Sequence, residues 1–194
     1  MISVVIVGTG NVAQNLFQAL DKEADVEIKQ VLGRNKNHLA FAKDKVSINT
    51  DFNQIPSADI YILAVSDDSI GLVAEKFKDS NGLIVHTSGA TSLEVLNECK
   101  RTGIFYPLQT FTTGKIISFD DIPICIEAKY KKNLELLQNL GKTLSKTVIE
   151  VNSERRKILH VAAVFVNNFT NYMYTIGADI CTENNVDFKL LLPL

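Results

Sequence analysis

The segment that most constrains the fold of this chain is a glycine-rich turn near its start. An apolar run, Ile2–Val7, leads into Gly8-Thr9-Gly10-Asn11-Val12-Ala13, and a helix-patterned stretch and a second apolar segment, Val26–Leu32, follow. In such a strand–turn–helix–strand context, the G-x-G-x-x-A pattern is typical of a dinucleotide-binding turn. The opening of the chain therefore predicts a βαβ unit with a cofactor at its first turn.

The small residues of this turn have separate expected tasks. Gly8 permits the tight turn, Gly10 leaves room for a pyrophosphate, and Ala13 lets the helix pack closely on the strand. The helix then directs unpaired backbone N–H groups and the positive end of its dipole at the phosphates. The residues expected to bind the cofactor here are Gly8, Thr9, Gly10, Asn11 and Val12. The alternative is a tight turn that binds nothing.

The end of the second apolar segment indicates which dinucleotide binds. A site for NAD usually carries Asp or Glu about 20 residues beyond the glycines, where the carboxylate accepts a hydrogen bond from the ribose 2′-hydroxyl. This chain instead reads Gly33-Arg34-Asn35-Lys36, with no acid. The planar guanidinium of Arg34 suits a 2′-phosphate, and Asn35 adds a donor. We therefore expect NADP(H) rather than NAD(H), with Gly33, Arg34 and Asn35 in the site; alternatively, Arg34 is a solvated residue that opens the next helix.

Charge and composition exclude several classes of function. The net charge is −2 with no long basic stripe, so we expect no nucleic-acid partner. No apolar run reaches the length of a membrane span, and the start lacks the features of a signal peptide. Three widely spaced cysteines without a C-x-x-C pattern fit reduced thiols in a cytoplasmic protein, and no histidine pair has ligand spacing. We expect a cytoplasmic protein with no metal and no membrane contact.

Residues 1–151 alternate short apolar runs with helical patterns, which predicts a Rossmann-type α/β domain with a doubly wound, mainly parallel sheet. The predicted strands are Ser3–Val7, Val26–Leu32, Ile60–Ala64, Leu83–His86, Gly103–Tyr106, Pro123–Glu127 and Thr147–Glu150, with 46–48 as a further short strand. The predicted helices are Asn11–Lys22, Lys36–Ala42, Ser69–Lys78, Ser92–Lys100 and Lys131–Leu144.

The pattern changes near Asn152. From Ser153 to Asn184 there is no proline, and apolar residues recur at steps of three and four. A helix of about 30 residues predicts the start of an all-α C-terminal domain, which we place at residues 152–194. One long helix cannot bury two apolar faces against the first domain alone. We therefore expect either that the natural chain continues or that the C-terminal helices form a homodimer.

In a doubly wound sheet, ligands bind beyond the carboxyl ends of the strands, so the residues after each strand are candidates. Val65 and Ser66 follow one strand and are expected beside the cofactor, whereas the next acids, 67 and 68, suit a helix cap. His86 and Ser88 follow the next strand, in a small polar loop that can hold a nicotinamide or a substrate carboxylate. His86 is either a proton donor or a half-buried residue satisfied by neighbouring backbone, and both alternatives stay open.

Two further groups of polar side chains are candidates for substrate binding. Gln109 follows Pro107 at the same rim of the sheet, although a proline-rigidified turn would explain it equally well. On the long helix His160, Asn167 and its neighbours at helical spacing can share one face, which predicts a polar cleft. The alternative is hydrogen bonding to a partner helix. The predicted catalytic residues are His86, Ser88, Gln109, His160 and Asn167.

Six motifs together resemble one known family. They are G-T-G-N-V, L-G-R-N, A-V-S-D-D, H-T-S-G-A, Y-P-L-Q-T-F and E-R-R-K-I-L-H-V-A-A-V-F-V-N-N-F-T-N. This combination resembles the Rossmann-like proteins with a DUF2520 helical domain, which are described as similar to F420-dependent NADP oxidoreductases or pyrroline-5-carboxylate reductase. The resemblance covers essentially the whole chain. It implies the fold, a nicotinamide cofactor and a helical domain that continues beyond the L-L-L-P-L segment.

The chain departs from its relatives in two places. The family often has His where this chain has Tyr106, which weakens a proton-transfer role at that position. More distantly, the layout is similar to 6-phosphogluconate and β-hydroxyacid dehydrogenases, whose long helix carries a Lys-x-x-x-Asn pair. Lys157 and Asn167 do not reproduce that spacing, so those roles do not transfer.

These observations support two functions of different class. The first is an NADP(H)-dependent oxidoreductase that transfers hydride between nicotinamide and a small polar molecule. The second is a non-catalytic NADP-binding sensor or assembly module, which the lack of an unambiguous acid–base pair favours. A deazaflavin hydride exchanger is a third possibility, since the resemblance includes F420-dependent proteins.

Overall fold

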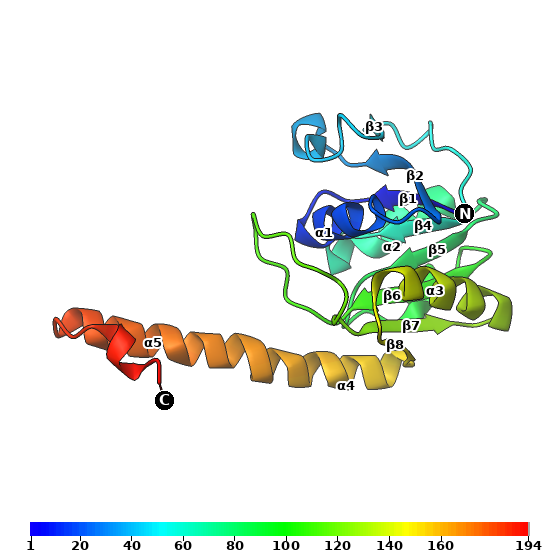
Figure 1. Ribbon diagram of the computed structural model, residues 1–194. Helices are drawn as coiled ribbons and strands as arrows, with labels where there is room; N and C mark the ends of the chain where they lie inside the picture. Colours follow the sequence, from blue (N-terminus) through cyan, green and yellow to red (C-terminus); the bar gives the residue numbers. More distant parts are fainter. Residues whose placement is uncertain (194) are drawn as a thin grey trace. The chain divides into compact units, whose positions relative to one another are not determined.

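The first strand of the computed structural model, β1 (Ile2–Val7), is an inner strand of an eight-stranded sheet. The other strands come from segments spread along residues 26–150. The structure describes residues 1–193. The remaining strands are β2 (Val26–Leu32), β3 (Ser47–Asn49), β4 (Ile60–Leu63), β5 (Leu83–His86), β6 (Thr102–Pro107), β7 (Ile124–Ala128) and β8 (Val148–Glu150). Their spatial order is β3-β2-β1-β4-β5-β6-β7-β8 (Figure 1).

All neighbouring strands run parallel except β6 and β7, which pair antiparallel. The chain moves outward from β1 to β3, returns to β4 beside β1, and then moves outward in the other direction. This reversal between β1 and β4 is the switch point at which doubly wound sheets bind ligands. The predicted Rossmann-type fold is therefore confirmed.

Alternate side chains of β1 enter two different layers, as the two-residue period of a strand requires. Val4 and Ile6 belong to the core on one face of the sheet, together with Leu16 of α1 (Asn11–Leu20) and Leu137 of α3 (Lys131–Leu144). Val5 and Val7 belong to the core on the other face, together with Ile70 and Phe77. The continuous apolar pattern of the central strands follows from burial on both faces.

Several connections between strands are shorter and tighter than the sequence pattern predicts. The predicted helix Ser69–Lys78 is a composite of η2 (Asp67–Ser69), α2 (Ile70–Ala74) and η3 (Glu75–Phe77). The predicted helix Ser92–Lys100 is wrong beyond a single 3-10 turn, η4 (Leu93–Leu96), and Lys36–Ala42 is reduced to η1 (Lys36–Leu39). Short 3-10 turns are typical of connectors that cannot extend into a full helix.

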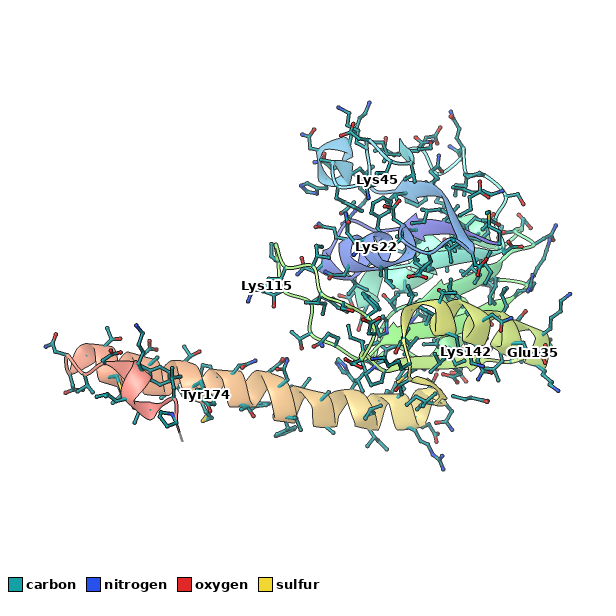
Figure 2. The ribbon with its side chains drawn as sticks, viewed as in Figure 1. Lys22, Lys45, Lys115, Glu135, Lys142 and Tyr174 are labelled. Carbon is teal, nitrogen blue, oxygen red and sulfur yellow. The ribbon has the colours of Figure 1, made fainter. Side chains whose placement is uncertain are left out.

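The connection between β6 and β7 lies on α1. Asn15, which is buried, donates through Nδ2 to the Lys115 carbonyl (3.2 Å) and accepts at Oδ1 from the Ile117 N–H (3.1 Å). Asn11, one turn earlier, donates to the Phe111 carbonyl at 3.0 Å. Figure 2 shows Lys115 on this loop, beside α1. Two asparagines of the first helix thus hold a loop from a distant part of the sequence.

The chain divides into two compact units, Met1–Lys157 and Ile158–Leu194. The predicted long helix consists of α4 (Ser153–Ala163), a π-helical segment η5 (Val164–Phe169) and α5 (Thr170–Glu183), and η6 (Phe188–Leu191) follows. The predicted domain 152–194 includes Leu194, which lies outside the described residues.

Within the second unit most large apolar side chains are exposed. Val166 is 76% exposed and Phe165 61%, and the rings of Phe165 and Phe169 stack with centroids 4.8 Å apart. Tyr174 of α5 contacts Phe188 of η6, and the two rings meet edge to face. In residues 1–193 no helix combines the length and the apolar character needed to cross a membrane.

Candidate cofactor site

A cavity of about 680 Å³ lies beyond the carboxyl ends of β1 and β4. Its floor is formed by the glycine turn, from Gly8 to Val12, and by Val65 and Ser66, which follow β4. A volume of this size is typical of sites for small molecules and cofactors. The switch point of the sheet and the glycine turn thus coincide, as the sequence predicts.

The two glycines of the turn, Gly8 and Gly10, have different surroundings. Gly8 has a φ of +138°, and a Cβ atom there would lie 2.0 Å from the Ala64 carbonyl oxygen, so only glycine fits between β1 and β4. At Gly10 the φ is −76°, and a Cβ atom would meet no protein atom within 4 Å. The protein does not require glycine at that position. The free space there lies in the cavity, where it suits a ligand.

The N-terminus of α1 opens at this free space. Gly10 is the N-cap residue, and no side chain caps the helix. The first backbone N–H groups of a helix have no partner within the helix, and they carry the positive end of its dipole. An anionic group in the cavity would supply the missing acceptors, as phosphates do at helix N-termini.

Two cationic side chains line the cavity. Arg34 and Lys76 are the charged residues among those that line it in the described part of the chain, and no carboxylate lines it. Neither cation forms an ion pair or a hydrogen bond with another described residue. The apolar side chains of Phe52, Leu72 and Val73 lie at the same cavity. This combination can accept a planar ring and an adjacent anion.

Not every residue predicted to bind the cofactor after the second strand lines the cavity. Gly33 and Arg34 do, whereas the side chain of Asn35 accepts a hydrogen bond from the Asn37 N–H and caps η1. Ser69, Leu72 and Lys76 line the cavity but were not predicted as site residues. These three residues follow β4 and are three and four residues apart. That spacing could have indicated a shared helix face toward the cavity, because residues so spaced lie on one side of a helix.

Other polar residues line the cavity from β5 and from the loop after β6. Thr87 lies directly after β5, and Gln109 and Phe111 lie on the loop that Asn11 holds. The Gln109 side chain accepts a hydrogen bond from the Thr110 N–H at 2.8 Å. Gln109 was predicted for this rim; Thr87 and Phe111 were not assigned to it.

His86 is fully buried at the end of β5 and does not line the cavity. Its Nδ1 accepts from the Ser88 N–H at 3.2 Å, so Nε2 carries the proton and faces the Ser92 carbonyl at 3.4 Å. Burial, and then the nearby charge of Arg156, lowers the pKa of His86 to about 4. This geometry favours the second of the two alternatives, a histidine satisfied by neighbouring backbone.

Ser88 closes the loop after β5 on itself. Its Oγ accepts from the N–H groups of Ala90 (3.1 Å) and Thr91 (3.0 Å) and donates to Thr91 Oγ1 (3.0 Å). The side chain is buried and does not line the cavity. Its neighbour Thr87 takes the position that the sequence suggests for Ser88.

Tyr106 is the last residue but one of β6, at the position where, by the sequence resemblance, the family often has His. Burial is the main cause that raises the pKa of this phenol to about 12. The hydroxyl therefore stays protonated across the physiological range. A group with so high a pKa is poorly matched to proton transfer near neutral pH.

The two candidates on the long helix belong to the second unit. Asn167 lies within the π-helical segment and accepts at Oδ1 from Asn171 Nδ2 at 3.1 Å. His160 lies about one turn before that segment, in α4, and is half-buried. A place for either residue in the cavity remains a prediction. Within residues 1–193 no cluster of three or more His, Cys, Asp or Glu is arranged to hold a metal ion.

Comparison with known proteins adds a family and several structural relatives. Residues 122–194 match the family model described as a domain of unknown function, DUF2520. A proposed NADP oxidoreductase from Bacteroides fragilis is 34% identical, over 99% of this chain and 76% of that chain, with a TM-score of 0.89. No curated protein matches the chain.

More distant solved structures share the fold. Pyrroline-5-carboxylate reductase from Coxiella burnetii is 18% identical over 97% of this chain and 73% of that chain, with a TM-score of 0.65. An imine reductase from Myxococcus stipitatus, solved in complex with NAD⁺, is 12% identical over 97% of this chain and 68% of that chain, with a TM-score of 0.68.

Proposed function

The chain belongs to the Rossmann-like proteins with a DUF2520 domain, and on this basis we propose that it is an NADP(H)-dependent oxidoreductase acting on a small polar substrate. The single observation that carries the proposal is the cavity at the switch point. It combines an open Gly10, an uncapped helix N-terminus and two cations without a carboxylate. The name given to the Bacteroides fragilis protein supports the same cofactor.

The residues present fit a dinucleotide with a 2′-phosphate. The N–H groups at the start of α1 would receive the pyrophosphate at the open side of Gly10. Arg34 and Lys76 would bind the 2′-phosphate, and Phe52 and Val73 would pack against the adenine. An acid that would accept from a 2′-hydroxyl is absent from the described lining residues. NADP(H) is therefore preferred over NAD(H).

The nicotinamide half would lie toward Ser66, Thr87 and Gln109, where the bound cofactor supplies a hydride for a carbonyl or imine carbon. Gln109 can donate or accept a hydrogen bond to orient the substrate. His160 and Asn167 remain candidates for the substrate side. His86 and Ser88 act indirectly in this proposal, because their polar atoms are already used within the loop.

A non-catalytic NADP-binding sensor or assembly module remains the second candidate. One observation favours it: no described lining residue is a His, Cys, Asp or Glu that would serve as an acid or base near neutral pH. NADPH oxidation at 340 nm with a panel of small carbonyl and imine substrates separates the two. Substrate-dependent oxidation above the background rate supports the enzyme, and its absence with NADPH bound supports the sensor.

For assembly we propose a homodimer formed through the second unit. Exposed apolar side chains recur from Ile158 to Leu192 in that unit, and a monomer rarely leaves so much apolar surface in contact with water. Light scattering is expected to give twice the chain mass, and Phe165→Asp with Tyr172→Asp is expected to give the mass of one chain. A wild-type mass of one chain would contradict this. A cytoplasmic location is proposed on the three unpaired cysteines.

A further inference from the structure

A buried guanidinium lies at the base of the loop that follows β5. Arg156, in the second turn of α4, belongs to the first compact unit and is fully buried. It does not line the cofactor cavity. A fully buried arginine is rare unless it has specific partners, so its contacts indicate its task.

Arg156 joins three segments that are far apart in the sequence. Its Nη1 donates to Glu127 Oε2 of β7 at 2.5 Å, and its Nη2 donates to the Thr91 carbonyl at 2.5 Å. Nη2 also lies 3.2 Å from Ser153 Oγ. That hydroxyl donates to Glu127 Oε2 (2.8 Å) and accepts from the Leu93 N–H (3.0 Å). The arginine and the serine thus fix both Thr91 and Leu93.

The loop that is fixed in this way forms part of the cavity wall. Thr87 lines the cavity, and Ser88 Oγ binds the N–H groups of Ala90 and Thr91. The Ser88 N–H binds His86 Nδ1 at the end of β5. One end of the loop is therefore held by the sheet and the other end by Arg156.

Stability alone does not account for this arginine. A buried ion pair is often no more stabilising than well-packed apolar residues of similar volume. In addition, Arg156 Nε is buried without a hydrogen-bond partner among the described residues, which is a cost. What an apolar residue cannot replace is the planar fork, which donates in two directions at a fixed geometry.

We propose that Arg156 is a positioning residue, which holds the loop Thr87–Thr91 in the conformation that receives the nicotinamide half of NADP(H). This inference rests on the proposed function for the identity of the ligand. In this proposal the adenosine half binds at Arg34 and Lys76 and does not depend on Arg156, because the contacts of Arg156 are to Glu127, Thr91 and Ser153, none of which lines the cavity.

The test compares two variants of Arg156 and one control variant with the wild-type chain. Arg156→Met combined with Glu127→Gln removes the fork without leaving an unpaired buried charge. Glu127→Gln alone is the matched control, because it leaves the bond from Arg156 to the Thr91 carbonyl in place. Arg156→Lys is the second variant if the double variant does not fold, since it keeps the charge and loses the fork.

Two measurements are made on each protein. Calorimetry gives the affinities for NADPH and for 2′,5′-ADP, which occupies only the adenosine half. We expect the double variant to bind NADPH roughly tenfold to a hundredfold more weakly, because the loop no longer holds its contacts to the nicotinamide half in place. We expect it to bind 2′,5′-ADP like the wild type. Hydrogen exchange at the amides of Thr91 and Leu93 is expected to become faster in the double variant, with the amides of β1 unchanged.

Three outcomes would contradict the inference. An unchanged NADPH affinity in a folded double variant would overturn it, as would an equal loss for NADPH and 2′,5′-ADP. Unchanged exchange at Thr91 and Leu93 would also overturn it, and that measurement needs no cofactor. Failure of the wild-type chain to bind NADPH would instead overturn the proposed function, so the two failures are distinguishable.

Discussion

Single residues of the glycine turn separate the demands of the fold from those of the ligand. Gly8 is required by the protein, because its φ is positive and the Ala64 carbonyl approaches it closely. Gly10 is not required by the protein, because the space beside it is empty of protein atoms. The motif alone does not distinguish these two reasons for glycine, whereas the structure does.

This difference leads to opposite predictions for two neighbouring substitutions. Gly10→Val is expected to leave the thermal midpoint unchanged and to abolish NADPH binding, because the side chain occupies the place of the pyrophosphate. Gly8→Ala is expected to lower the free energy of unfolding by about 1–3 kcal/mol through backbone strain and the clash with Ala64. Calorimetric unfolding and NADPH titration of both variants check this. A Gly10→Val protein that binds NADPH normally would refute the assignment of the turn.

Arg34 is predicted to select the cofactor. Arg34→Met should weaken NADPH binding roughly tenfold to a hundredfold, the worth of charge-assisted hydrogen bonds, and should leave NADH binding nearly unchanged. Lys36→Met is the matched control, because Lys36 is exposed nearby and does not line the cavity. Equal losses for both cofactors in Arg34→Met would argue against a 2′-phosphate at this residue.

His86 is predicted to make the protein less stable in mild acid. Its pKa is about 4 in the folded chain against an ordinary 6.5, so the unfolded chain binds the extra proton first as pH falls. The free energy of unfolding is therefore unaffected by this proton above pH 6.5. It falls by about 3 kcal/mol in total as the pH is lowered from 6.5 to 4. Urea unfolding from pH 8 to pH 4 should show this loss in the wild type and a smaller one in His86→Gln. Parallel pH profiles would show that His86 is not responsible.

At the scale of elements, the strands follow from the sequence better than the helices do. Val26–Leu32 was predicted to the residue, because apolar residues recur along it and Gly33 follows its last residue. The helix predicted over Ser92–Lys100 reduces to one turn, because local periodicity carries no information about how tightly the chain must return to β6. The π-helical segment Val164–Phe169 has no sequence signature of its own.

The same limit applies to the site. The glycine turn and Arg34 were found because their spacing to a strand is characteristic. Lys76 and Thr87 were missed, because membership of the cavity depends on which side of a helix or loop faces it. The contacts of Arg156 join residues up to 65 positions apart, and no local pattern reports such pairs.

The loop between β6 and β7 is predicted to depend on Asn15. Asn15→Leu removes both bonds to the loop and leaves the Ile117 N–H and the Lys115 carbonyl unpaired, at a cost of about 1–3 kcal/mol. Trypsin should then cleave after Lys115 faster than in the wild type. Gln18→Leu, one turn later on α1, is the control and should cleave at the wild-type rate. Equal cleavage of Asn15→Leu and the control would mean that other contacts hold the loop.

At the scale of the whole molecule, the two compact units differ in how they treat apolar side chains. The first unit buries them in a layer on each face of its sheet. The second unit, from Ile158 onward, leaves most of its large apolar side chains exposed. All residues that line the cofactor cavity belong to the first unit. The residues proposed to contact substrate, His160 and Asn167, belong to the second.

The most direct test of the account is a calorimetric titration of the wild-type chain with NADPH and with NADH. We expect one NADPH bound per chain, at least about tenfold more tightly than NADH, because only the 2′-phosphate of NADPH gives Arg34 and Lys76 an anionic partner. Binding of neither cofactor, or binding of NADH as tightly as NADPH, would contradict it.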